Sequence, residues 1–394
     1  MLGRRAVVAT AGVLALCATG CSGGTPQAGA PSGTPSSSPA PASSSAPPDT
    51  ATQASQEQRL TPAQQAGQRV IYSYPGKTVP ASLLAHVKAG EVAGVIFFKE
   101  NIPSRAQLAA AIDKLNAANA QSPVKQPLLL LTDQEGGQIR RLPGAPESSA
   151  KEDGAAADPV AAARRSGTEA AQNLAGVGMN ANAAPVLDVY RKPGDFADRT
   201  ERSYSRDPRA VAADAGAFAE AQQAGGVAAT AKHFPGLGSA TATANTDEEP
   251  VTLDVPLETL RSVDEAPYPS LIKSGVRMIM SSWAIYPALD PKRPAGLSPA
   301  VVRKELRERL GFGGVTITDA LEAKALRQFG DSGRRGLLAA QAGEDLILAS
   351  GRSVAQGEQV ATALRNGLAS GELDGADNAA ALDRITELRS GLGH

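Results

Sequence analysis

The chain has 394 residues, about the length of one large α/β domain with a tail. Its formal net charge is −1, so no basic field points to nucleic acid and no acidic run points to a solvating tail. The two cysteines, Cys17 and Cys21, lie near the N-terminus, which excludes a disulfide framework from the rest of the chain.

The first twenty residues have the three parts of an export signal. Arg4-Arg5 is followed by an apolar run that ends at Cys17, and small residues then precede Cys21. The apolar run is too short for a membrane-spanning helix. Small residues directly before a cysteine resemble a bacterial lipobox, so we expect a signal peptide at residues 1–20 and acylation of Cys21. The alternative is ordinary signal cleavage beside an incidental cysteine.

Residues 21–58 are mostly Ser, Pro, Thr, Ala and Gly, with almost no charge. Such a stretch buries too little apolar surface to offset its ordering entropy, so it is predicted to be a disordered tether. With an acylated Cys21, the tether would hold residues 59–394 at the outer face of the bacterial cell membrane.

Residues 59–394 alternate short apolar runs with longer helical patterns. The predicted strands are Val70–Tyr74, Gly94–Phe98, Pro127–Asp133, Met179–Asp188, Val227–His233, Val276–Ser282, Gly314–Asp319 and Asp345–Ala349. Several are almost continuously apolar, as expected of parallel strands buried on both faces. Helix starts are predicted at Asp158-Pro159, Asp207-Pro208 and Ser298-Pro299. Eight such alternations favour a (β/α)₈ barrel of the TIM type over a doubly wound sheet.

Polar side chains close five of the predicted strands: Asp133, Asp188, Lys232-His233, Ser281-Ser282 and Asp319. Barrel enzymes place their chemistry at the carboxyl ends of the strands, so we expect these groups around one pocket mouth. The alternative is that each merely caps a strand or a helix. Carboxylates facing a pocket suit cleavage of a glycosidic bond, where one attacks the sugar and a second group handles the proton.

Other chemistries fit the sequence less well. The three histidines include only one at a strand end, so a catalytic zinc site would be short of ligands. The sequence has no dinucleotide fingerprint, no phosphate loop and no G-x-S-x-G elbow. We therefore expect no metal and no organic cofactor.

Seven short segments carry a family resemblance: Gly94-Val95-Ile96-Phe97-Phe98, Asp133-Gln134-Glu135-Gly136-Gly137, Ala184-Pro185-Val186-Leu187-Asp188, Arg202-Ser203-Tyr204, Lys232-His233-Phe234-Pro235-Gly236, Tyr286-Pro287-Ala288-Leu289-Asp290 and Thr318-Asp319. Together, over about residues 61–388, they resemble the family 3 glycoside hydrolases, specifically the single-domain β-N-acetylglucosaminidase branch.

The resemblance implies a role for each matching residue. Asp319 corresponds to the family nucleophile, and Asp133 to an aspartate that hydrogen-bonds sugar hydroxyls. Arg202 and the pair Lys232-His233 match residues that grip the same terminal sugar. Arg141 matches a basic residue after the Asp-Gln-Glu-Gly-Gly turn. The alternative for each binding residue is a structural ion pair.

The sequence departs from the family at the proton donor. Relatives carry Lys-His-Phe-Pro-Gly-His-Gly and then Asp-Ser-His on a mobile loop, whose histidine is the acid/base. Here no histidine lies between His233 and His394, and Asn245-Thr246-Asp247 stands about where Asp-Ser-His would. We infer that Asp247, or failing that Glu248, is the acid/base. The alternative is an ordinary acidic surface loop. Because a carboxylate repels phosphate, we predict hydrolysis rather than phosphorolysis.

These expectations describe a monomeric, exported and lipid-anchored enzyme that acts on carbohydrate. It would remove terminal β-linked N-acetylglucosamine, with peptidoglycan fragments as the natural source. Two alternatives remain open: a glycan-binding lipoprotein that has lost catalysis, and a β-glycosidase of other sugar specificity.

Overall fold

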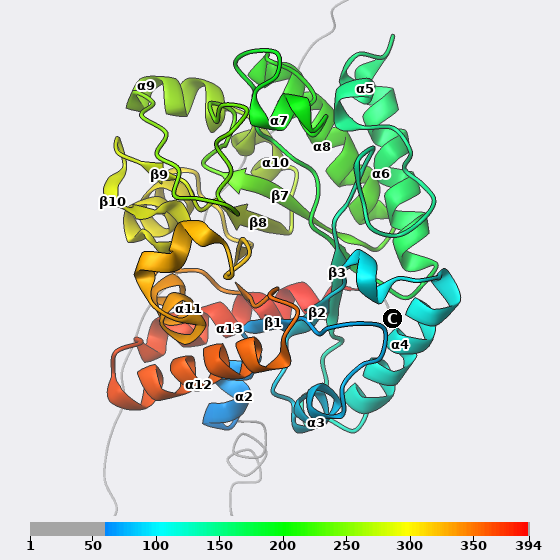
Figure 1. The fold of residues 1–394 in the computed structure, drawn as a ribbon, viewed down its shortest axis with the longest axis vertical. Coiled ribbons are helices and arrows are strands. Elements are labelled where there is room, and N and C mark those ends of the chain that lie inside the picture. Colours follow the sequence, from blue (N-terminus) through cyan, green and yellow to red (C-terminus); the bar gives the residue numbers. More distant parts are fainter. Residues whose placement is uncertain (1–59, 393–394) are drawn as a thin grey trace, which may run out of the picture. The chain divides into compact units, whose positions relative to one another are not determined.

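Eight short parallel strands form the central sheet of the computed structural model, which describes residues 60–392 (Figure 1). They are β1 (Val70–Tyr72), β2 (Gly94–Ile96), β3 (Leu129–Thr132), β6 (Ala181–Asn182), β7 (Ala228–Phe234), β8 (Met278–Ser281), β11 (Val315–Thr318) and β12 (Ile347–Leu348). The order is β11-β8-β7-β6-β3-β2-β1-β12. Each lies within a predicted strand except β7, which extends one residue beyond the predicted Val227–His233. The predicted signal peptide, Cys21 and tether lie outside the described residues.

The sheet closes into a barrel between its first and last strands in this order. Leu346, just before β12, bridges Ile317 of β11 in parallel. The Leu346 amide donates to the Thr316 carbonyl at 2.9 Å, and the Thr318 amide donates to the Leu346 carbonyl at 3.0 Å. The prediction of a (β/α)₈ barrel is confirmed.

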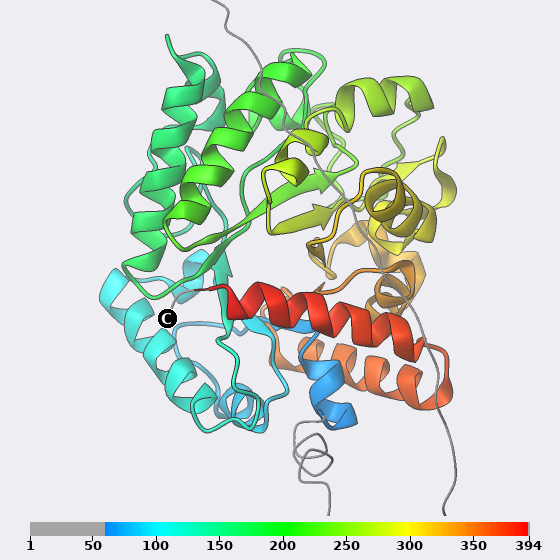
Figure 2. The ribbon, with the colours of Figure 1, turned by 180° about the vertical axis from the view of Figure 1, so that it is seen from behind.

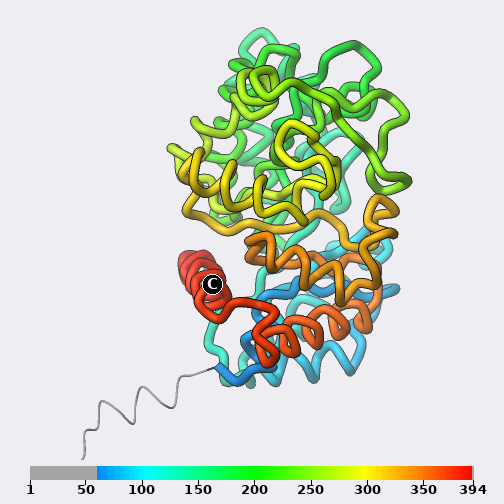
Figure 3. The backbone as a smooth tube through the Cα atoms, turned by 90° about the vertical axis from the view of Figure 1, so that its left-hand side faces the viewer, coloured from blue at the N-terminus to red at the C-terminus, as the bar shows by residue number. Residues whose placement is uncertain are grey.

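Helices surround the barrel between successive strands (Figure 1). The α-helices are α2 (Pro62–Gly67), α3 (Ala81–Ala89), α4 (Arg105–Asn119), α5 (Ala150–Gly154), α6 (Pro159–Ala175), α7 (Phe196–Arg199), α8 (Pro208–Ala224), α9 (Leu257–Thr259), α10 (Tyr268–Lys273), α11 (Ser332–Ala342), α12 (Val354–Ser370) and α13 (Gly375–Ser390). Near the end of the chain, α12 packs beside α2, so late and early segments adjoin (Figure 3).

Two of the three predicted helix caps are present. The Asp158 carboxylate accepts from the Ala161 amide at 3.1 Å, and the Asp207 carboxylate accepts from the Arg209 amide at 2.9 Å. The prediction for Ser298 is wrong in its capping role, because its hydroxyl donates to Asp290 at 2.7 Å instead. The helix that follows is a π-helix, Ala300–Arg309.

Apolar side chains fill the barrel, and α13 covers its amino-terminal end (Figure 2). Ile385 and Leu388 of α13, with Leu392 just after it, join the cluster of inward-facing strand residues. Burying each of these side chains contributes about 1.5–3 kcal/mol. Arg389 fixes the helix there by donating to the carbonyl of Pro127, just before β3, at 2.6 Å. The opposite, carboxyl end of the barrel is therefore the open one.

Within residues 60–392, no helix is both long and apolar enough to cross a membrane.

Candidate active site

A pocket of about 530 Å³ opens at the carboxyl ends of the strands. All seven residues predicted for the site line it: Asp133, Arg141, Arg202, Lys232, His233, Asp247 and Asp319. They come from four βα units, those of β3, β6, β7 and β11, so only closure of the barrel brings them together.

A second cavity, of about 670 Å³, lies near the amino-terminal ends of β3 and β6. Lys125 is the only charged residue in its wall, beside amide and apolar side chains. It offers no carboxylate or imidazole for acid/base chemistry, so the smaller pocket is the candidate active site.

Two buried cations and two carboxylates form an alternating network on one wall of the pocket. The Lys232 ammonium lies 2.9 Å from the Asp133 carboxylate and 2.7 Å from that of Glu135. The Arg202 guanidinium donates two hydrogen bonds of 2.8 Å to the two oxygens of Glu135. Arg141 lies 3.6 Å from Asp133 on its other side. Buried charges are tolerated only when paired in this way.

The charges of this network outweigh the effect of burial. Burial would raise the pKa of Asp133, but Lys232 and Arg141 hold it below its ordinary value. Burial would lower the pKa of Lys232, but Asp133 and Glu135 raise it. Asp133 is therefore ionised and Lys232 protonated around neutral pH, so one can accept and the other can donate hydrogen bonds in the pocket.

A short hairpin brings Arg141 back to Asp133. Strands β4 (Gln134–Gly136) and β5 (Ile139–Arg140) pair antiparallel directly after β3. The Arg141 amide then donates to the carbonyl of Asp133 at 3.2 Å. The basic residue after the Asp-Gln-Glu-Gly-Gly turn thus lies in the pocket through local structure.

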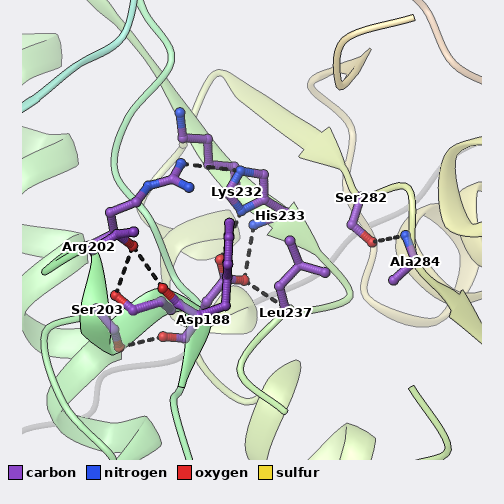
Figure 4. A network of polar contacts seen from close by, with 12 residues as sticks. Asp188, Arg202, Ser203, Lys232, His233, Leu237, Ser282 and Ala284 are labelled. Atoms are coloured by element: carbon purple, nitrogen blue, oxygen red, sulfur yellow. Dashed lines mark hydrogen bonds and ion pairs between the residues drawn. The ribbon is translucent and has the colours of Figure 1, made fainter. Parts of the chain in front are cut away.

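His233 is oriented by Asp188 from the neighbouring strand end (Figure 4). The His233 Nδ1 atom lies 2.8 Å from the Asp188 carboxylate, which also accepts from the Leu237 amide at 2.7 Å. A carboxylate only accepts, so Nδ1 carries the proton. Nε2 faces the Arg202 guanidinium at 3.5 Å, and a guanidinium only donates. Nε2 is therefore the acceptor of the ring, and Arg202 lies at the limit of hydrogen-bond distance from it.

Lys232 and His233 both line the pocket although they are consecutive in β7. Consecutive residues of a regular strand point to opposite faces. The peptide bond between these two is cis, and the register of β7 against β8 shifts at this point.

The loop that carries Asp247 is attached to the segment that follows Asp319. The Lys324 amide donates to the Asp247 carbonyl and the Ala325 amide to the Thr246 carbonyl, each at 3.1 Å. The Asp319 carboxylate accepts from the Ala320 amide at 2.7 Å. Asp247 remains exposed at the pocket mouth, but partial loss of solvent on its pocket side and the negative charge of Asp319 raise its pKa.

Glu248, the fallback candidate for the acid/base, lies outside the pocket. Its exposed carboxylate forms an ion pair with Lys324. The loop therefore presents one carboxylate to the pocket and directs the next away from it.

Residues 73–388 match the glycosyl hydrolase family 3 N-terminal domain. The chain belongs to this family of glycoside hydrolases. It is 46% identical over 332 residues to an uncharacterized secreted glycosyl hydrolase of Arthroderma benhamiae, covering 84% of this chain and 94% of that protein. It is 34% identical to the β-hexosaminidase of Xylella fastidiosa strain M23, over 66% of this chain and 77% of that enzyme.

Solved structures of family 3 enzymes have the same fold. The β-N-acetylglucosaminidase from Paenibacillus sp. str. FPU-7 superposes with a TM-score of 0.79 at 31% identity, and the match covers 84% of this chain but 63% of that one. The β-N-acetylhexosaminidase from Beutenbergia cavernae superposes with a TM-score of 0.76 at 30% identity, over 84% of this chain and 99% of that one. The family predicted from the seven segments is confirmed.

Two strand-end groups of this family 3 hydrolase lie behind the pocket, contrary to prediction. Asp188 is buried behind His233 and orients it. Ser282 is buried too, and its hydroxyl lies 3.0 Å from that of Tyr286, which donates to the Gly236 carbonyl at 2.9 Å. Neither lines the pocket: Asp188 contacts His233, which does, whereas Ser282 contacts Tyr286, which does not.

The pocket also contains residues that the sequence interpretation missed. Glu322 lines it and accepts from the Ser350 hydroxyl, with Ser350 Oγ 3.0 Å and 3.1 Å from the two carboxylate oxygens. Arg352 lines it and lies over the Phe98 ring, 4.4 Å from the centroid. Only their positions after β11 and β12 could have indicated them. Glu135 stands within a quoted motif, but nothing in its spacing shows that it joins two cations.

Among residues 60–392, no group of three or more His, Cys, Asp or Glu side chains is arranged to hold a metal ion. The pocket instead combines two neighbouring carboxylates with fixed donors and acceptors, the groups that glycosidic bond cleavage uses.

Proposed function

We propose that this family 3 enzyme is a retaining β-N-acetylhexosaminidase that hydrolyses terminal β-linked N-acetylglucosamine. The proposal rests on the presence of Asp319 and Asp247 in one pocket, where the charge of Asp319 contributes to a raised pKa of Asp247. Similarity to β-hexosaminidases supports the choice of sugar.

Asp319 would act as the nucleophile and Asp247 as the acid/base. The Asp319 carboxylate attacks the anomeric carbon while the bond to the leaving oxygen breaks, and Asp247 gives that oxygen its proton. Water then attacks the glycosyl-enzyme, Asp247 takes a proton from it, and the bond to Asp319 breaks. The sugar leaves with retained configuration and both carboxyl groups return to their first state.

The electrostatics of the pair suit this exchange of roles. The negative charge of Asp319 is one cause of the raised pKa of Asp247. Forming the ester removes that charge, so the pKa of Asp247 falls when it must act as a base.

The buried network would hold the terminal sugar. Lys232 and Arg202 would donate, Asp133 would accept, and Nε2 of His233, which Arg202 approaches only at 3.5 Å, would accept a hydroxyl proton. Arg141 is placed to donate beside Asp133. These contacts strengthen as water leaves the pocket.

The proposed natural substrates are peptidoglycan fragments. Arg199 and Arg352 line the pocket beyond the network, and such cations suit an aglycone that carries carboxylates. Similarity to a secreted hydrolase supports export, and an acylated Cys21 would keep a monomeric enzyme at the membrane surface beside this material.

Neutralising the carboxyl groups one at a time tests the assignment of the acid/base. Asp247→Asn should lower kcat/KM for a β-linked disaccharide by about 10²–10⁴-fold, and less for a nitrophenyl substrate whose leaving group needs no proton. Glu248→Gln is the matched control, because Glu248 is the next residue in the chain but its carboxylate lies outside the pocket.

Three results would argue against parts of the proposed function: the acid/base, the sugar specificity, or catalysis itself. A disaccharide rate unchanged by Asp247→Asn but abolished by Glu322→Gln would transfer the role to Glu322. Turnover of a β-glucoside in preference to the acetamido sugar would indicate a β-glycosidase of other specificity. Sugar binding without turnover of any substrate would indicate a glycan-binding protein.

A further inference from the structure

Glu135 is buried behind the pocket and does not line it, yet it contacts two of the cations that do, Lys232 and Arg202. Its Oε1 atom lies 2.7 Å from the Lys232 ammonium and 2.8 Å from Arg202 Nη2, while Oε2 accepts from Arg202 Nε at 2.8 Å. The Lys232 side chain is 2% exposed, so few water molecules can replace a lost partner.

We propose that Glu135 is the positioning residue of the sugar site, fixing Lys232 and Arg202 where they can bind the terminal sugar without touching the sugar itself. The inference rests on the proposed function, since it takes this pocket as the sugar site.

The geometry requires a carboxylate at this position. All three contacts of Glu135 are donations from cations, so both of its oxygens must accept. A glutamine would turn an NH₂ group towards Lys232 or Arg202 and lose at least one contact. Among residues 60–392, Arg202 would then have no carboxylate within ion-pair distance. The repulsion between the positive charges of Arg202 and Lys232 would be less well compensated.

The charged groups around Lys232 define a pH signature. Asp133 and Glu135 favour its protonated form, Arg202 opposes it, and Arg141 lies beyond Asp133. Removing Glu135 takes away one of the two favourable charges, so Lys232 should lose its proton at a lower pH. A residue that merely supported the fold would not produce this change.

The test compares Glu135→Gln with wild type in the full chain, with a nitrophenyl β-N-acetylglucosaminide. We expect kcat/KM to fall by about 100-fold, as when one partner of a buried charge pair is removed. We also expect KM of the variant to rise with pH at alkaline values where that of the wild type stays flat.

Glu305→Gln is the matched control. Glu305 is also a buried glutamate that accepts two hydrogen bonds from one arginine, Arg261, at 2.7 Å and 2.9 Å, but it lies away from the pocket. It should lose stability and keep its kinetic constants and pH profile.

Two results would overturn the proposal: kcat/KM of folded Glu135→Gln within about threefold of wild type, or a large loss without the new pH dependence. If Glu135→Gln does not fold, Glu135→Asp keeps the charge and shortens its reach. It should raise KM with a flat pH profile, and an unchanged KM would contradict the proposal. If the wild type turns over the substrate and the Glu135 variants do so equally well, only this inference fails. If the wild type shows no turnover, the proposed function fails and this inference fails with it.

Discussion

Replacing Asp188 by asparagine should change the tautomer of His233. The Oδ1 atom of Asp188 accepts the amides of His233 and Leu237, and an asparagine oxygen can keep both bonds. The new NH₂ group would replace Oδ2, which faces His233 Nδ1 at 2.8 Å. Because an NH₂ group only donates, Nδ1 must give up its proton and Nε2 must gain one.

The magnitude follows from the bonds that change. One charge-assisted hydrogen bond becomes a neutral one, which should cost about 1–2 kcal/mol of the free energy of unfolding. Nε2 then points an N–H towards Arg202 and no longer accepts from the sugar. Loss of one such acceptor should reduce kcat/KM by roughly 10- to 100-fold.

Nitrogen-15 chemical shifts of the imidazole rings report the tautomer directly. The sequence has three histidines, so the His233 resonances can be assigned by single substitutions. Urea unfolding gives the stability and nitrophenol release the activity. If Asp188→Asn keeps the wild-type tautomer of His233 and the wild-type kcat/KM, Asp188 does not control the tautomer of His233. Asp188→Ala, which leaves buried donors without a partner, should be less stable than Asp188→Asn.

Three further predictions concern packing, stability and pH. Gly94→Ala should lower the free energy of unfolding, measured in urea, by about 1–3 kcal/mol, because the added Cβ would lie 2.2 Å from a backbone carbonyl oxygen of β3. Gly375→Ala is the control and should be neutral or stabilising, because its added Cβ would have nothing within 4 Å. Equal losses of stability in the two variants would contradict the prediction. His86 lies 2.9 Å and 3.0 Å from two glutamate carboxylates, which raise its pKa above 6.5 although burial opposes them. The stabilisation by protonated His86 is thus complete below pH 6.5 and is lost as the pH rises through the raised pKa of the folded state. His86→Gln should therefore make the free energy of unfolding less dependent on pH in this range. An unchanged slope would contradict the prediction. If Asp247 is the acid, kcat/KM should decline on the alkaline side of the pH profile as Asp247 loses its proton at its raised pKa. Asp247→Asn should remove this alkaline decline. Sugar phosphate as the main product in phosphate buffer would contradict a carboxylate as the acid/base.

The strands and the four pocket residues that end them, Asp133, Lys232, His233 and Asp319, could be predicted because each is a local pattern. Arg141, Arg202 and Asp247 were predicted from the family resemblance instead. A continuously apolar run such as Leu128–Leu131 forms a buried strand, and the polar residue after it must lie at the carboxyl end of the barrel. The direction of a side chain depends instead on the neighbouring elements. Ser282 therefore turned out to support Gly236 through Tyr286, and Ser298 to bond Asp290 rather than cap its helix.

The roles of buried partners were harder to foresee. Glu135 and Asp188 contact residues that are 67 and 45 positions away in the sequence. Only the packed barrel shows that one joins two cations and the other orients an imidazole. The position of Glu248 was equally hard to foresee. It directly follows Asp247, which lines the pocket, yet its carboxylate pairs with Lys324 outside the pocket.

Trapping the glycosyl-enzyme tests the central claim most directly. The full chain would be incubated with an activated 2-fluoro sugar, digested and analysed by mass spectrometry, with nitrophenol release from the β-N-acetylglucosaminide and the β-glucoside measured in parallel. We expect one labelled peptide modified at Asp319, preference for the acetamido sugar, and neither label nor turnover in Asp319→Asn. A label on another carboxylate, or turnover that survives in Asp319→Asn, would contradict this expectation.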